Sequence, residues 1–260
     1  MTGWTLITGA SEGLGAEFAR LAAAEGRNLI LTARSQDKLA ALARELQGRA
    51  GEIAVIPADL SEATGADRLW QEASRDRRID ILVNNAGLGR HGAFGSVDGW
   101  ARDLSTMAVN MTALTGLMSR AIPHMDAQGG GRILNVGSTA GFMPGPNMAV
   151  YHATKAYVLS LTEAVAEELR GTNVRLCVLC PGATQTGFFD AADMHGIGLL
   201  KLGRPARADA VARAGWQAMM QGRRIRVTGA MNRIFAFAPR LAPRALTAFI
   251  AGRVMGKWGA

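Results

Sequence analysis

Apolar runs of strand length alternate with segments of helical pattern along most of this chain. The runs expected to form strands are residues 4–8, 28–33, 52–57, 79–84, 131–137, 173–180 and 225–228. The segments expected to form helices are residues 14–25, 36–47, 62–75, two stretches within 100–127, 149–170 and 208–221. Continuous apolar strands separated by helices predict a parallel sheet covered on both faces. Right-handed crossovers then make the α/β sheet doubly wound.

The 260 residues fit one large α/β domain, expected over 1–230, with a C-terminal extension over 231–260. A hydrophobic content of 48% and a charged content of 19% exclude a mostly disordered chain. No secretory leader and no apolar run of spanning length are found, so we expect a cytoplasmic protein. Residues 187–205, rich in glycine and small side chains, are expected to form a variable substrate loop at the carboxyl ends of the strands.

A glycine-rich turn, T-G-A-S-E-G-L-G over residues 8–15, directly follows the first predicted strand. Glycines let the backbone turn tightly and approach a pyrophosphate. The helix that begins there offers free N–H groups and the positive end of its dipole. The turn therefore predicts a dinucleotide site, although G-x-x-x-G-x-G also fits an ordinary strand–helix turn. The expected contacts are Gly9, Ser11, Gly13, Leu14 and Gly15.

The second predicted strand ends at Arg34, where NAD-binding folds carry an acid that bonds the ribose 2′-hydroxyl. A guanidinium can instead pair with a 2′-phosphate through two parallel hydrogen bonds. Ser11 can add a hydroxyl donor. The pattern favours NADP(H) over NAD(H), the alternative being a solvated arginine at a strand end.

Two further turns are candidate cofactor contacts. Asp59 and Leu60 follow the third strand, where the carboxylate can accept from an adenine amino group or cap the next helix. Asn85, Ala86 and Gly87 follow the fourth strand, where they can pack beside a cofactor and brace the sheet, or form a simple turn.

Ser138, Tyr151 and Lys155 form the constellation that bears most directly on chemistry. Ser138 ends the fifth strand, and Tyr151 and Lys155 stand i and i+4 on the following helix, which places them on one face. A tyrosine alone is a poor acid or base at neutral pH, and a neighbouring ammonium is expected to lower its pKa toward the working range. Ser138 can hold a substrate oxygen at the tyrosine hydroxyl.

With these motifs in order, the chain resembles the short-chain dehydrogenase/reductase family over about residues 5–186. The resemblance implies a Rossmann-like, doubly wound, mostly parallel sheet of seven strands in the order 3-2-1-4-5-6-7. It also implies a catalytic tetrad in which Asn110 joins Ser138, Tyr151 and Lys155, with Tyr151 and Lys155 also contacting the cofactor. Pro181, Gly182 and Thr186 would cover the nicotinamide, and subunits would pair as a homodimer or homotetramer.

The resemblance implies an NADP(H)-dependent oxidoreductase acting on a carbonyl or secondary alcohol, with an apolar or carrier-linked substrate. Met148, Phe188 and Phe189 can line such a pocket, although core packing explains them almost as well. The alternative is a non-catalytic NADP(H)-binding regulator on the same fold. Neither the substrate nor the direction of the reaction can be read from the sequence.

The basic charge gathers at the C-terminal end. Residues 201–260 hold 12 Lys and Arg against one acid, while the whole chain has a net charge of +8. Residues 231–260 mix arginines with large apolar side chains, and Pro239 and Pro243 are expected to divide them into short helices. This extension can lie on an anionic membrane, guide an acidic carrier-bound substrate, or pack on the body or a partner subunit. No nucleic-acid-binding motif accompanies the charge.

The remaining Cys and His residues are interpreted as structural or left as weak candidates. Cys177 and Cys180 lie on one predicted strand and point to opposite faces, so no disulfide and no metal site are expected. His152 is expected to be structural and His124 to be solvated. His91 and His195 are weaker candidates for the substrate pocket.

Overall fold

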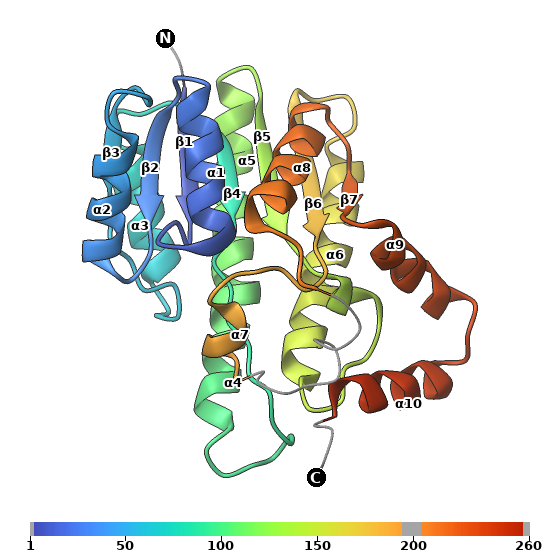
Figure 1. Ribbon diagram of the computed structural model, residues 1–260. Coiled ribbons are helices and arrows are strands. Elements are labelled where there is room, and N and C mark those ends of the chain that lie inside the picture. The colour runs from blue at the N-terminus through green and yellow to red at the C-terminus, as the bar shows by residue number, and fades with distance from the viewer. Residues whose placement is uncertain (1–2, 194–203, 257–260) are drawn as a thin grey trace.

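One sheet forms the centre of the protein, and its seven strands are all parallel (Figure 1). The computed structural model describes residues 3–193 and 204–256. The strands are β1 (Trp4–Thr8), β2 (Asn28–Thr32), β3 (Ile53–Val55), β4 (Ile79–Asn84), β5 (Gly131–Val136), β6 (Val174–Cys180) and β7 (Ile225–Val227). Their order, β3-β2-β1-β4-β5-β6-β7, confirms the predicted topology.

The helices alternate with the strands as expected. They are α1 (Gly13–Ala24), α2 (Gln36–Leu46), α3 (Gly65–Ser74), α4 (Trp100–Met107), η1 (Ala108–Ala113), α5 (Leu114–Ala127), η2 (Thr139–Phe142), α6 (Ala149–Glu168), α7 (Phe188–Ala191), α8 (Ala208–Met220), α9 (Ala230–Phe237), η4 (Ala238–Arg240) and α10 (Arg244–Met255). The two helices expected within 100–127 are joined by the π-helical turn η1. The sequence did not predict this turn, which interrupts the ordinary i→i+4 ladder.

Each face of the sheet packs against its own helical layer, because side chains alternate along every strand. On β4, Ile81 and Val83 pack with α1, α2 and α8, whereas Leu82 packs with α3, α5 and α6. Cys177 and Cys180 follow the same rule on β6 and lie in the two opposite clusters. Both are free, as predicted from their spacing.

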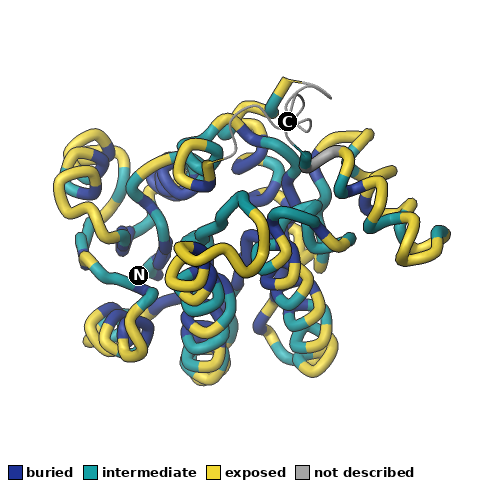
Figure 2. The backbone as a smooth tube through the Cα atoms, turned by 90° about the horizontal axis from the view of Figure 1, so that it is seen from below, coloured by how far each residue is buried: buried dark blue, intermediate teal, exposed yellow. Residues whose placement is uncertain are grey.

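The C-terminal segment leaves the body after β7 as α9, η4 and α10 (Figure 1). Prolines divide it as expected, because Pro239 opens η4 and Pro243 precedes α10, positions where a missing N–H costs little. Seen from below in Figure 2, this segment is mostly exposed or half-buried. None of the described helices is long and apolar enough to cross a membrane.

Candidate active site

Most of the predicted site residues lie at the carboxyl edge of the sheet, because they follow the ends of parallel strands (Figure 1). Turns after β1, β2, β3, β4 and β6 carry the predicted cofactor contacts. The catalytic candidates come from η1, the end of β5 and α6. The predicted substrate loop lies partly outside the described residues, since 194–203 are not described, and His195 falls there.

The glycine-rich turn has a backbone that other residues would strain. Gly9 and Gly13 adopt φ values of +63° and +56°, in the left-handed region that favours glycine. A Cβ on Gly15 would stand 2.1 Å from the Gly9 carbonyl oxygen, so α1 could not begin so close to the turn. The turn therefore forms a bare backbone cradle at a helix N-terminus, which fits a pyrophosphate.

The turn after β4 braces this cradle. Asn85 Nδ2 donates to the carbonyl oxygens of Thr8 and Gly9, at 3.0 and 3.1 Å. The Thr8 hydroxyl accepts from the N–H groups of Asn85 and Ala86, at 2.9 and 3.0 Å. These bonds fix the two turns to each other, so the bracing half of the Asn85 interpretation is confirmed.

The ends of β2 and β3 carry Arg34 and Asp59. Arg34 is exposed, and its guanidinium has no hydrogen bond with the part of the chain that the structure describes. Hydrogen bonds from the Ser61 hydroxyl and N–H lower the Asp59 pKa, and the Arg34 charge adds to this effect. Asp59 does not cap the next helix, as one interpretation had it, because α3 begins only at Gly65. The Leu60 side chain lies in the core.

A cavity of about 530 Å³ borders the cradle, and Ser11, Glu12, Gly13 and Thr186 are among its lining residues. The Lys38 ammonium pairs with the Glu12 carboxylate there at 2.6 Å. Thr186 Cγ2 would lie 3.0 Å from a Cβ built on Gly13, so the segment after β6 reaches over the glycine-rich turn.

Ser138, Tyr151 and Lys155 come together between β5 and α6. The Ser138 hydroxyl accepts from the Ala140 N–H at 3.1 Å and lies close enough to the Tyr151 hydroxyl to act on its pKa. Lys155 Nζ lies 5.8 Å from the Tyr151 ring centroid and donates to the Val136 carbonyl oxygen at 2.8 Å. Two half-buried hydroxyls and a buried ammonium thus share one corner of the site.

The pKa values in this corner differ from the expectation that the ammonium lowers the tyrosine pKa. Burial raises the pKa of Tyr151 to about 12, and the nearby Ser138 side chain opposes this only in part. Burial also lowers the pKa of Lys155 to about 8. Desolvation penalises the charged form of each group and is the largest cause of both shifts.

Asn110 lies in the π-helical turn η1 and connects three elements. Its Oδ1 accepts from the Leu88 N–H at 2.9 Å, and its Nδ2 donates to the Leu88 carbonyl oxygen and to Thr154 Oγ1, at 2.9 and 3.0 Å. Thr154 Oγ1 in turn donates to the Tyr151 carbonyl oxygen at 2.8 Å. The sequence analysis missed Thr154, although it is a polar residue on the buried face of α6 beside the Tyr–Lys pair.

Gly87 lies where Asn110 and Lys155 approach each other. A Cβ on Gly87 would stand 3.5 Å from both Asn110 Oδ1 and Lys155 Nζ. The absent side chain therefore leaves space between an acceptor and a donor. Such a space, lined by polar atoms, suits a hydrogen-bonded water.

Apolar side chains pack against the tyrosine ring. The rings of Tyr151 and Phe188 are 5.2 Å apart between centroids, and Met148 and Phe189 pack in the same small cluster. Gly89 faces it, since a Cβ there would meet Phe188 Cζ and Tyr151 Cδ2 at about 3 Å. The predicted apolar lining is therefore assembled beside the hydroxyl.

Two arginines that the sequence analysis did not single out form ion pairs that connect the elements around this apolar cluster. Arg90 and Asp103 form a buried, two-pronged ion pair with contacts of 2.9 and 3.2 Å, tying the loop after β4 to α4. Arg102 on α4 pairs with Asp193 and donates to the Ala191 carbonyl oxygen at 2.8 Å, which ties α4 to α7. No motif marks these residues, because their partners are far apart in the sequence.

His152 and His124 both have structural partners. The structural interpretation of His152 is confirmed, because its Nδ1 bonds the Met143 carbonyl oxygen at 2.9 Å. The prediction that His124 is solvated was wrong. Its Nε2 accepts from the Ile79 N–H at 3.2 Å and its ring stands edge-on to Trp70, because the end of α5 packs on the sheet.

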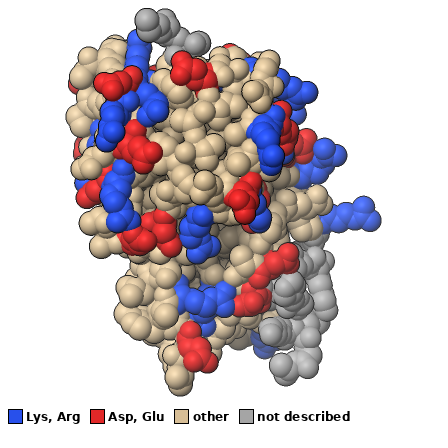
Figure 3. Space-filling view, turned by 90° about the vertical axis from the view of Figure 1, so that its left-hand side faces the viewer, with Lys and Arg blue, Asp and Glu red and all other residues tan. Residues whose placement is uncertain are grey.

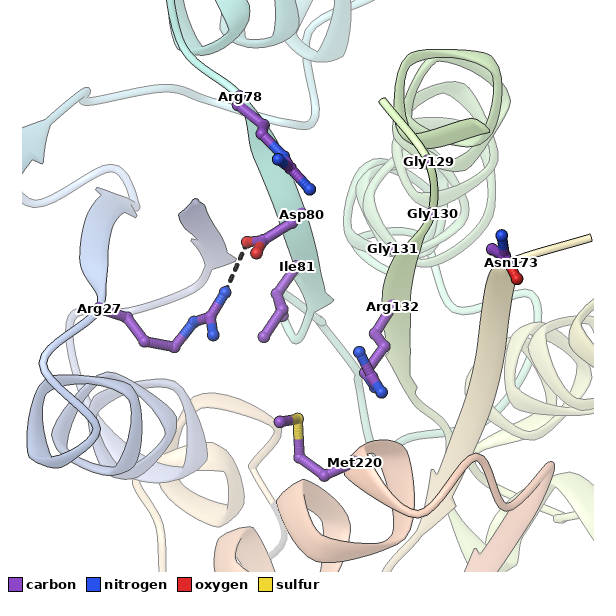
Figure 4. Close-up of a pocket in the computed structure, with 10 residues that line it drawn as sticks. All are labelled: Arg27, Arg78, Asp80, Ile81, Gly129, Gly130, Gly131, Arg132, Asn173 and Met220. Carbon is purple, nitrogen blue, oxygen red and sulfur yellow. Dashed lines mark hydrogen bonds and ion pairs between the residues drawn. The ribbon is translucent and has the colours of Figure 1, made fainter. Parts of the chain in front are cut away.

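A cavity of about 220 Å³ at the amino edge of the sheet lies apart from this site (Figure 4). Arg27 and Asp80 pair there at 2.6 Å, and Arg78 and Arg132 stand nearby. It contains none of the predicted site residues. Among the described residues, no group of three or more metal-ligating side chains is found.

Comparisons with known proteins agree with this geometry. The short chain dehydrogenase family matches residues 3–195. The ketoacyl reductase HetN of Nostoc sp. is 37% identical over 190 residues, which are 72% of this chain and 66% of that protein. The chain thus spans slightly less than two thirds of that relative's length.

Solved structures extend the likeness to nearly the whole fold. A short-chain dehydrogenase from Sphingobium yanoikuyae in complex with NADPH is 30% identical with a TM-score of 0.82, and the match covers 94% of each chain. A short-chain dehydrogenase/reductase from Burkholderia phymatum in complex with NAD is 27% identical with a TM-score of 0.79, over 92% of each chain. With its glycine-rich turn and Ser–Tyr–Lys corner, the chain belongs to the short-chain dehydrogenase/reductase family of oxidoreductases.

Proposed function

We propose that the protein transfers a hydride between NADP(H) and a carbonyl compound or secondary alcohol. The observation that carries the proposal is the corner where Ser138, Tyr151 and Lys155 meet beside a glycine cradle. A bound nicotinamide dinucleotide would supply or accept the hydride, and the protein would supply placement and electrostatics.

Tyr151 is the proposed acid in reduction and base in oxidation. Its high pKa keeps the hydroxyl protonated, so it can donate to an oxygen that becomes negative during reduction. Ser138, close to the Tyr151 hydroxyl, would bond the same substrate oxygen and stabilise the developing charge.

Lys155 and Asn110 would control the proton on Tyr151. A pKa of about 8 lets Lys155 take or release a proton near neutral pH. We propose that Asn110 Oδ1 and Lys155 Nζ hold a water in the space that Gly87 leaves, which would connect Lys155 to solvent. Thr154 would position this group through its bonds to Asn110 and to the backbone of Tyr151.

The cofactor preference follows from Arg34. Its exposed guanidinium stands at the end of β2 beside the cradle, where it can pair with a ribose 2′-phosphate. The two related structures hold NADPH in one case and NAD in the other, so the preference rests on this arginine and on Ser11. The other proposed contacts are Gly9, Gly13, Leu14, Gly15, Asp59, Leu60, Asn85, Ala86, Gly87, Pro181, Gly182 and Thr186.

The proposed substrate is apolar or carried on a larger apolar group. Phe188, Phe189 and Met148 form an apolar cluster with the Tyr151 ring. A ketoacyl reductase among the relatives is consistent with a carbonyl on an apolar chain. We also propose a cytoplasmic homodimer or homotetramer whose main domain covers residues 1–230.

The test is the rate of NADPH consumption with ketones and aldehydes of graded size and polarity. We expect turnover that rises with apolar size and is slower with NADH. Tight NADPH binding without turnover on any carbonyl, or on the matching alcohols with NADP⁺, would instead support the non-catalytic regulator.

A further inference from the structure

The segment of α9, η4 and α10 exposes a series of large apolar side chains, here named the tail surface. Each member is between 44% and 77% exposed. The members are Met231, Ile234, Phe235, Phe237, Leu241, Leu246, Phe249 and Ile250. Single exposed apolar residues are ordinary, but eight within twenty residues indicate a surface that binds something.

The helical spacing shows that three of these side chains share one side on each of the two α-helices. On α10, Leu246, Phe249 and Ile250 stand at i, i+3 and i+4, while Ala251 on the opposite side is buried. The adjacent Gly252 faces the body, since a Cβ there would lie 3.4 Å from Pro146. On α9, Met231, Ile234 and Phe235 repeat the spacing, with Ala236 buried. Small residues thus contact the body, and the large ones remain exposed.

The charge of this segment has a single sign. Residues 230–256 contain Arg233, Arg240, Arg244 and Arg253 and no Asp or Glu. The Arg253 guanidinium lies 5.0 Å from the Phe249 ring centroid, so cation and ring occupy the same outward side. By contrast, Figure 3 shows basic and acidic side chains interspersed on the face that it presents.

We infer that the tail surface binds a lipid bilayer that carries anionic headgroups. Exposed Phe, Leu and Ile side chains can enter the headgroup boundary, while arginines reach the lipid phosphates. A second copy of this chain fits less well, because pairing the surface with itself across a two-fold axis would bring eight arginines together without an acid.

Docking would place the catalytic edge of the sheet near the membrane. The Asn232 amide lies against Gly182, which follows β6, and α10 lies against Pro146 in the loop between Ser138 and Tyr151. Figure 1 shows α10 at the end of the molecule toward which the strands point. The inference itself concerns binding only and does not depend on the proposed reaction.

The test is sedimentation of the full chain with vesicles of phosphatidylglycerol and phosphatidylcholine at low salt, compared with phosphatidylcholine alone. We expect binding to the anionic vesicles that weakens at high salt. The variant Arg244→Glu/Arg253→Glu should bind more than about tenfold more weakly. Its matched control, Arg49→Glu/Arg223→Glu, changes net charge equally at exposed positions by the amino edge of the sheet and should keep binding within about twofold.

A second variant, Leu246→Ser/Phe249→Ser/Ile250→Ser, removes the apolar contribution and should weaken binding by a similar factor. If it fails to fold, as judged by its melting temperature, the charge pair decides. The inference is overturned if wild type does not sediment with anionic vesicles, or if tail and control charge variants lose binding equally. It is also overturned if either tail variant lowers the molar mass in vesicle-free solution, since the surface would then join copies of the chain.

Discussion

The two halves of the carboxyl edge are built from different parts of the chain. The cofactor half, formed by the turns after β1 and β2, consists of backbone at Gly9, Gly13 and Gly15 and one exposed cation at Arg34. The catalytic half consists of side chains that are held by other side chains and by backbone carbonyls. In the first half, an atom added to one of these glycines should therefore weaken cofactor binding. In the second half, removing a side-chain atom should lower kcat or change stability.

The sharpest test of the cofactor half is Gly15→Ala. The added Cβ would stand 2.1 Å from the Gly9 carbonyl oxygen, so α1 must move away from the cradle. We expect NADPH affinity to fall by about 100-fold, measured by fluorescence titration.

Its control is Gly116→Ala on α5, where the nearest atom is the flexible end of Arg120 at 3.4 Å. That variant should bind NADPH normally and be slightly more stable. Equal behaviour of the two variants would mean that the cradle does not depend on its close backbone approach.

The catalytic half predicts a pH effect at Lys155. Burial lowers its pKa to about 8 from a usual value of 10.5, so the unfolded state binds more protons between these pH values. Stability should therefore rise with pH across this window. Relative to Lys155→Met, the cofactor-free wild type should gain about 2 kcal/mol in unfolding free energy between pH 7 and pH 9.5. Urea unfolding at both pH values measures it, and a difference that does not change with pH would contradict the assigned burial.

The exposed cation of the cofactor half predicts a smaller effect. Arg34→Ala should raise KM for NADPH about tenfold, because it removes a charge-assisted bond to the 2′-phosphate. KM for NADH should hardly change, since that cofactor has no such phosphate. Equal changes for both cofactors, in steady-state rates, would remove Arg34 from cofactor selection.

The smallest predicted effect belongs to Thr154, a positioning residue. Thr154→Val removes two neutral hydrogen bonds, one from Asn110 Nδ2 and one to the Tyr151 carbonyl oxygen, so kcat should fall about fivefold with KM for NADPH unchanged. Thr154→Ser should restore kcat.

Thr162→Val is its matched control, because Thr162 Oγ1 also accepts from an asparagine amide and donates to a backbone carbonyl on α6. It should cost similar stability and leave kcat unchanged. If kcat falls in both variants, the effect of Thr154→Val comes from a general loss of stability and not from the positioning of Asn110.

The sheet could be predicted from the sequence because buried parallel strands are uninterrupted apolar runs. β1 and β4 have the predicted bounds. β3 is shorter than predicted, because it is an edge strand that pairs only with β2 through Ile53, Ala54 and Val55. The η1 turn could not be predicted, since a π-turn leaves no periodic signal in side-chain type.

At the site, motifs identified residues but not their surroundings. Tyr151 and Lys155 could be found from their spacing, yet the direction of their pKa shifts depends on burial, which only the fold sets. The Arg90–Asp103 pair and the exposure of α10 likewise depend on tertiary packing. The extension could be predicted to be basic and apolar, but which side it exposes could not.

The central claim is that the Tyr151 hydroxyl exchanges the proton that accompanies hydride transfer. Tyr151→Phe removes only that oxygen from a ring already packed on Phe188. The account predicts that kcat with a ketone accepted by wild type falls about 1,000-fold, while NADPH affinity stays within about threefold. Turnover within about threefold of wild type would contradict it.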